Sequence, residues 1–215
     1  MYAKSYEPEE AVIKQLQTLY GMEEYKIIYD QTKALSKKHP KSVLVNKFLG
    51  LSSLKLNNFQ DALKTFKKLI ELEPNNSDWH LNLGAALQSI GRPQDAVVAI
   101  GQSISIKNDN PIAYNNLGNA LASAGNTSGA IKAYSLAISY KPDYAYAYNN
   151  LGNVLHEIGN IRECIMFYSN ALEHKKNYTK AYLNLLKLNV QLSNIQLPKL
   201  DEDNFLHSLS KSRLF

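Results

Sequence analysis

A six-residue segment recurs four times in this chain, and each copy begins 34 residues after the previous one. A fixed period of this length is typical of stacked structural repeats, so we expect an array of repeats rather than one globular core. Each repeat buries its apolar face against the next, which leaves an extended surface suited to binding another macromolecule. The four copies are WHLNLG from Trp79, AYNNLG from Ala113, AYNNLG from Ala147 and AYLNLL from Ala181.

The apolar spacing inside each repeat predicts a pair of helices. We number the repeats from 1 to 34, starting at residues 9, 43, 77, 111 and 145. In the repeats that start at 111 and 145, positions 4, 7 and 11 are apolar and position 8 is small, which is the spacing of one helical face. A small residue at position 20 and a bulky one at position 24 predict a second helix packed closely on position 8. Cys164 holds position 20 of its repeat, and we expect it to be a buried packing residue rather than a reactive thiol.

Turn residues recur in the same register as the core. Position 15 holds glycine in three repeats, where the end of the first helix needs a left-handed residue. Position 16 holds asparagine in three repeats, which predicts side-chain caps for the second helices. These residues are Gly91, Gly125 and Gly159, and Asn58, Asn126 and Asn160.

This pattern, with proline at position 32 of a 34-residue unit, resembles the tetratricopeptide repeat (TPR) family. The resemblance implies an all-α fold, a right-handed superhelical solenoid of antiparallel helix pairs. Two repeats depart from the pattern. The first has Ile28 and Thr32 at positions 20 and 24. The third has Trp79 one place early and His80 in the aromatic position, so we expect a local shift in helix packing there.

The repeat register divides the chain into three parts. Residues 1–8 are expected to be an N-terminal tail, residues 9–192 the TPR domain, and residues 193–215 an irregular C-terminal tail. Pro198 falls inside the next second helix, so we expect the stack to end there with a capping helix at Asp201–Leu209. An imperfectly capped end would also allow homo-oligomers. The predicted repeats are 9–42, 43–76, 77–110, 111–144 and 145–178, followed by a half repeat, 179–192.

The face of the first helix opposite the core contains positions 2, 5, 6, 9, 12 and 13, and the family resemblance implies that it lines a concave groove. Asparagine holds position 6 in four consecutive repeats, although its side-chain amide competes with the helical backbone. We therefore predict a peptide-binding groove on this face. Its candidate residues are Asn82, Asn115, Asn116, Asn119, Tyr146, Asn149, Asn150, Asn153, Lys180 and Asn184.

The asparagine column has two interpretations. Its amides can hydrogen-bond the backbone of an extended peptide, or they can bridge adjacent repeats and solvate an exposed face. A similar column is found in the repeat arm of O-linked N-acetylglucosamine transferases, which implies binding of an extended peptide. A second branch of the family, the carboxylate-gripping co-chaperones, uses cations at two positions that are not basic here, so Lys180 would have to act alone.

No catalytic chemistry is predicted from the sequence. The five histidines are dispersed, without the spacing of metal ligands, and no nucleophile or phosphate-binding motif occurs. We therefore expect a protein that is not an enzyme and binds no metal or cofactor. The leading hypothesis is an adaptor that binds an extended peptide or a partner protein in its groove. The alternative is the substrate-recruiting arm of a glycosyl- or sulfotransferase whose catalytic domain is absent.

Composition limits the other partners. The net charge is +5, but residues 1–76 scatter their 12 lysines among 9 acidic residues, so nucleic acid is not expected as a partner. No apolar run is long enough to predict a membrane span. The chain has a single cysteine and its N-terminus resembles no export signal. We therefore expect a cytoplasmic protein.

Overall fold

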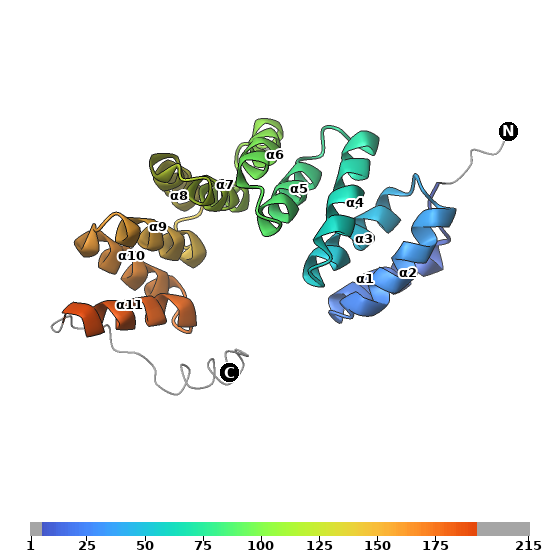
Figure 1. Cartoon of the computed structure of the whole chain (residues 1–215). Coiled ribbons are helices and arrows are strands. Elements are labelled where there is room, and N and C mark those ends of the chain that lie inside the picture. The colour runs from blue at the N-terminus through green and yellow to red at the C-terminus, as the bar shows by residue number, and fades with distance from the viewer. Residues whose placement is uncertain (1–5, 193–215) are drawn as a thin grey trace. The chain divides into compact units, whose positions relative to one another are not determined.

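The computed structural model describes residues 6–192, which form eleven α-helices and no strand (Figure 1). This confirms the predicted all-α class. The predicted capping helix at Asp201–Leu209 lies outside the described residues. The helices are α1 (Glu10–Gly21), α2 (Tyr25–Lys38), α3 (Val43–Lys55), α4 (Phe59–Leu72), α5 (Ser77–Ser89), α6 (Pro93–Ile106), α7 (Pro111–Ser123), α8 (Thr127–Tyr140), α9 (Ala145–Glu157), α10 (Ile161–His174) and α11 (Thr179–Leu192).

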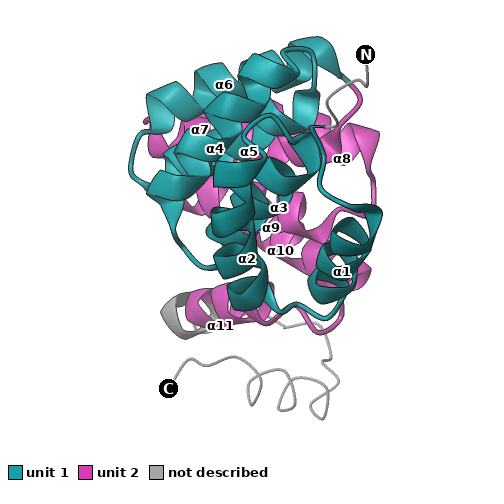
Figure 2. Cartoon of the chain, turned by 90° about the vertical axis from the view of Figure 1, so that its right-hand side faces the viewer, with its two compact units in different colours: residues 1–108 teal, residues 109–215 magenta. Residues whose placement is uncertain are grey.

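The chain divides into two compact units, residues 1–108 and residues 109–215 (Figure 2). The first unit contains α1–α6 and the second contains α7–α11. Within each unit every helix packs on the next one in the sequence, so helix pairs are stacked on helix pairs. The periodicity of the sequence, which runs across residue 108 without a break, contains no sign of this division.

The turn inside each pair has the predicted left-handed residue. Gly91, Gly125 and Gly159 have φ angles of +75°, +80° and +78°. The first two repeats keep the same turn without glycine, since Glu23 and Asn57 have φ angles of +60° and +59°. A left-handed conformation is unfavourable for most L-residues. The repeat architecture therefore imposes the turn, and glycine at this position only relieves its strain.

Side-chain caps follow the prediction in part. The Asn126 side chain accepts a hydrogen bond from Gly129 N at 2.9 Å and so caps α8. Asn58 and Asn160 hold the same position, but neither side chain caps its helix, so the prediction was wrong for them. The Asn160 amide instead donates to Glu163 Oε2 at 2.8 Å. This bond holds the amide in an orientation in which its oxygen accepts no N–H of the helix.

The core is built where the small residue at position 8 meets the bulky residue at position 24, as predicted. A Cβ atom placed on Gly118 would lie 2.5 Å from the Tyr134 ring. A Cβ on Gly84 would lie 2.4 Å from Ile100 Cγ1. In the four pairs with glycine at position 8, from α3/α4 to α9/α10, the helices are therefore closer than a larger side chain allows. In the first pair the fully buried Leu16 holds this position.

The residues that depart from the family pattern still fill core positions. Ile28, Thr32 and Cys164 are fully buried, and burial raises the pKa of the Cys164 thiol. This confirms the packing role predicted for the cysteine. The third repeat keeps the burial pattern of the later ones, so the expected local shift in helix packing stays a prediction. Trp79 is 5% exposed at position 3, where later repeats bury alanine, while His80 is only half-buried.

Glycine substitutions at two sites test this packing. Gly118→Ala should lower the free energy of unfolding by about 1–3 kcal/mol, because the new methyl group overlaps the Tyr134 ring. Gly101 lies in α6, and no atom lies within 4 Å of the point that an added Cβ would occupy. Gly101→Ala should therefore raise that free energy by about 0.5–1 kcal/mol through helix propensity. Urea titrations measure both values, and equal effects of the two substitutions would contradict the close contact.

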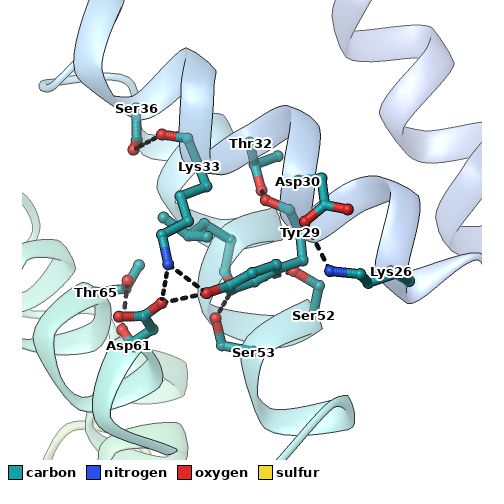
Figure 3. A network of polar contacts seen from close by, with 11 residues as sticks. Lys26, Tyr29, Asp30, Thr32, Lys33, Ser36, Ser52, Ser53, Asp61 and Thr65 are labelled. Atoms are coloured by element: carbon teal, nitrogen blue, oxygen red, sulfur yellow. Dashed lines mark hydrogen bonds and ion pairs between the residues drawn. The ribbon is translucent and has the colours of Figure 1, made fainter. Parts of the chain in front are cut away.

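A polar network joins α2 to α4 in the first unit (Figure 3). Lys33 Nζ lies 2.8 Å from Asp61 Oδ2 and donates to Tyr29 Oη at 2.5 Å, while the tyrosine hydroxyl donates to the same carboxylate. The hydrogen bonds from Lys33 and Tyr29 lower the pKa of Asp61. These hydrogen bonds join the second helix of the first repeat, α2, to the second helix of the next repeat, α4.

This pKa shift gives the network a pH dependence. A carboxyl group whose pKa is lowered on folding stabilises the protein above its unfolded pKa, about 4. The contribution is lost as pH falls through the lower, folded pKa. Asp61→Asn should therefore lower Tm at neutral pH, and its Tm should approach that of the parent protein as the solution is acidified below about pH 4. A Tm difference that stays constant with pH would contradict the network.

Candidate binding groove

A hollow of about 730 Å³ lies in the second unit, between α7, α9, α11 and the loop before α11. Most of the predicted groove residues line it. Asparagines at positions 5 and 9 of two consecutive repeats form one part of its surface, and tyrosine and lysine side chains form another. The predicted residues that line the hollow are Asn115, Asn119, Tyr146, Asn149, Asn150, Asn153 and Lys180.

The other three predicted residues have different surroundings. Asn184 is not part of the lining but donates hydrogen bonds to Asn149 and Asn153, which are. Asn116 accepts a long hydrogen bond, 3.5 Å, from Asn115 Nδ2. Asn82 belongs to the first unit, and its amide donates to Asp78 O of its own helix.

The position-6 asparagine of α9 connects two repeats. Asn150 Nδ2 donates to Asn115 Oδ1 and to Asn119 Oδ1 on α7, both at 3.0 Å. Asn119 Oδ1 also accepts a hydrogen bond from Tyr134 Oη on α8 at 2.8 Å. One amide thus ties the first helix of a repeat to both helices of the previous repeat.

The same arrangement occurs one repeat later. Asn184 Nδ2 on α11 donates to Asn149 Oδ1 at 3.1 Å and to Asn153 Oδ1 at 2.9 Å. Asn153 Oδ1 in turn accepts from Tyr168 Oη at 2.9 Å. The bridging interpretation of the asparagine column is therefore observed at Asn150 and Asn184.

Hydrogen-bond capacity shows which amides remain for a ligand. A primary amide has two N–H donors, and Asn150 and Asn184 each use both on the preceding repeat. Asn119 and Asn153 are bonded through their oxygens only, and within residues 6–192 their Nδ2 atoms donate to no partner. The position-9 asparagines therefore line the hollow with oriented amides whose N–H groups are available to a ligand.

The tyrosines of the hollow were mostly missed in the sequence. The Tyr146 and Tyr178 rings meet edge to face with centroids 5.1 Å apart, and Tyr144 lies 6.0 Å from Tyr146. Lys175 Nζ lies 4.6 Å above the Tyr146 ring centroid and 5.4 Å from that of Tyr178. Lys175 also donates to Tyr146 Oη at 2.7 Å. Tyrosine at position 34 of two repeats was an available signal, because Tyr144 and Tyr178 both hold that position.

Two tyrosines of the hollow have raised pKa values. Burial, with smaller contributions from Tyr146 and Tyr144, raises the pKa of Tyr178 to about 12. Burial also raises the pKa of Tyr144. Their hydroxyl groups therefore stay neutral and can donate hydrogen bonds to a bound segment.

The described residues show no site for a metal ion and no membrane span. No group of three or more histidine, cysteine, aspartate or glutamate side chains among them is placed to hold a metal. None of the described helices is long and apolar enough to cross a bilayer.

Stacked helix pairs with a polar groove define a helical-repeat protein, and sequence profiles agree. Profiles described as tetratricopeptide repeat match residues 53–121 and 145–178, and one described as TPR repeat matches residues 118–159. The chain belongs to the tetratricopeptide repeat family, whose members are generally non-catalytic scaffolds for protein interactions. No curated protein matches the sequence.

Solved structures of TPR proteins are similar in fold. MamA is 25% identical over 75% of this chain and 94% of its own, with a TM-score of 0.66. TTC0263 of Thermus thermophilus is 16% identical over 85% of this chain and 100% of its own, with a TM-score of 0.71. YrrB, described as a TPR protein with an unusual peptide-binding site, is 17% identical over 81% of this chain and 90% of its own, with a TM-score of 0.64.

Two asparagines at the same repeat position test the bridging role. Asn150→Ala removes both hydrogen bonds to α7 and should lower the free energy of unfolding by about 1–3 kcal/mol. Asn82→Ala removes only a bond within its own helix and should change stability little, since alanine favours the helix. Chemical denaturation of both variants gives the comparison. A cost for Asn82→Ala as large as that for Asn150→Ala would argue against the bridge.

Proposed function

We propose that this protein is a non-catalytic interaction module whose second unit binds an extended segment of a partner protein in the asparagine-lined hollow. The observation that carries the proposal is the pair of position-9 amides, Asn119 and Asn153, which line the hollow with unbonded N–H donors. They occupy equivalent places in consecutive repeats. Such donors suit the backbone carbonyl oxygens of an extended chain.

Orientation is the reason that these amides favour binding. Each position-9 oxygen accepts two hydrogen bonds, one from a tyrosine and one from the next repeat. The N–H groups therefore keep one direction before a ligand arrives, which reduces the entropy lost on binding. Backbone recognition of this kind would give affinity with a weak requirement for side-chain sequence.

The tyrosines and lysines of the hollow add a preference for particular side chains. Tyr144, Tyr146 and Tyr178 offer ring edges and faces for apolar or aromatic side chains of the segment. Lys175 and Lys180 line the same hollow and would favour acidic residues nearby. The partner segment is thus expected to be extended, with aromatic or apolar side chains beside acidic ones.

The comparisons support this class of function. TPR proteins are generally interaction scaffolds, and YrrB is described as having a peptide-binding site. The transferase-arm hypothesis gains no support from the described residues or from the family match. We keep a cytoplasmic location and homo-oligomerisation through a chain end as predictions.

Aspartate at position 9 provides a selective test. Asn119→Asp with Asn153→Asp keeps the oxygens that accept from Tyr134 and Tyr168 and removes the unbonded N–H donors. Peptides selected on the parent protein from a random-sequence phage display library should bind the double variant at least about tenfold more weakly by calorimetry. Asn75→Asp with Asn108→Asp, at exposed sites outside the hollow, adds the same charge and should leave affinity unchanged.

NMR locates the ligand independently of affinity. The side-chain amide signals of Asn119 and Asn153 should shift when a selected peptide is added, because their N–H groups are the expected donors. Selected peptides that bind both aspartate double variants as tightly as the parent, with those signals unmoved, would place binding outside this hollow.

A further inference from the structure

A second hollow, of about 260 Å³, lies in the first unit between α2, α3 and α4. Four lysines line it, Lys33 and Lys37 on α2 and Lys64 and Lys68 on α4. Asp61 is the only carboxylate in its lining. This lysine-lined hollow shares no residue with the asparagine-lined hollow, which belongs entirely to the second unit.

The single carboxylate is already neutralised. Asp61 is held by Lys33 and by the Tyr29 hydroxyl, as Figure 3 shows. Within residues 6–192, Lys37, Lys64 and Lys68 form no ion pair. Three ammonium groups in one small hollow therefore have no counter-charge in direct contact.

Lys68 shows the cost of this arrangement. Its pKa is lowered by burial first and then by the positive charge of Lys64, while the negative charge of Glu71 raises it by less. An anion in the hollow would relieve the repulsion between the two lysines.

The hydroxyl groups of the lining already donate hydrogen bonds within the protein. Ser36 Oγ donates to Lys33 O at 3.1 Å, and Thr65 Oγ1 donates to Asp61 O at 2.7 Å. Both hydroxyl protons are thus used on the backbone. The ammonium groups of the three unpaired lysines are the donors left for a ligand.

We propose that this hollow is a second binding site, which accepts an anionic side chain, carboxylate or phosphoryl, from an acidic segment of a partner protein among Lys37, Lys64 and Lys68. The hollow is local, and the basic residues beyond it are interrupted. Lys26 on α2 is paired with Asp30, and Glu71 follows Lys68 on α4. A continuous nucleic-acid backbone would have to pass both acids, whereas a short acidic segment can end beside the hollow.

Fluorescence anisotropy with labelled hexaglutamate peptide tests the proposal at low ionic strength, with hexaglutamine as the neutral control. Lys64→Gln with Lys68→Gln should weaken binding of hexaglutamate at least about tenfold. Lys107→Gln with Lys132→Gln removes the same charge from exposed lysines outside the hollow. This control should change affinity by less than about twofold, which general electrostatic attraction accounts for.

Further arms distinguish the source of the anion. Replacing one glutamate of the peptide by phosphoserine should increase affinity if the site prefers a phosphoryl group, and leave it unchanged or lower if it prefers carboxylates. Circular dichroism melting checks that the variants fold. Lys37→Gln with Lys64→Gln, both exposed, replaces the first pair if the half-buried Lys68 proves necessary for folding.

Three results would overturn the proposal. The first is equal loss of hexaglutamate binding in the site and control variants, which would reduce the effect to net charge. The second is no binding of either acidic peptide by the parent protein. The third is lysine-dependent binding that is tighter for oligouridylate or for phosphatidylserine vesicles than for the acidic peptides, which would name a different class of partner.

Discussion

The close approach of the two helices in each pair that has glycine at position 8 is the contact on which the rest of this structure depends. Gly118 and Gly152 allow the tyrosine rings of the second helices to lie against the backbone of the first. In the second unit those tyrosines are Tyr134 and Tyr168. Their hydroxyl groups then reach the asparagine one residue after the glycine. Core packing and groove chemistry are thus joined through a single side chain in each of these two repeats.

Stacking between repeats adds a second level of order. Apolar contacts between helices are tolerant of small shifts, because hydrophobic burial has no direction. The amide bridges of Asn150 and Asn184 do have direction, and each selects one register against the preceding repeat. Apolar burial therefore holds the repeats together, and the amide bridges set their alignment.

The sequence predicted the fold well because the relevant signals are local. Helical spacing, the glycine at Gly125 and the packing position of Cys164 all depend on residues within one repeat, and the structure agrees with each. The candidate site was harder. The Asn150 amide bonds Asn119 of the preceding repeat rather than facing a ligand. That outcome depends on distances between repeats, which residues within one repeat do not reveal. Tyr178 was overlooked because it lies in the turn before a helix, where face analysis does not apply. The division near residue 108 has no marker in the periodicity at all.

The amide bridge between two repeats depends on four side chains only, so substitutions could introduce it elsewhere in the stack. In the first unit Asn82 already holds the donor position, but the places equivalent to its two acceptors are Lys47 and Leu51. The place equivalent to the orienting tyrosine is Phe66, whose ring lies against Gly50 as Tyr134 lies against Gly118. Three substitutions, K47N, L51N and F66Y, would place the same set of side chains in the first unit. A protein engineer could thus build a separate amide-lined surface in the first unit without redesigning a backbone.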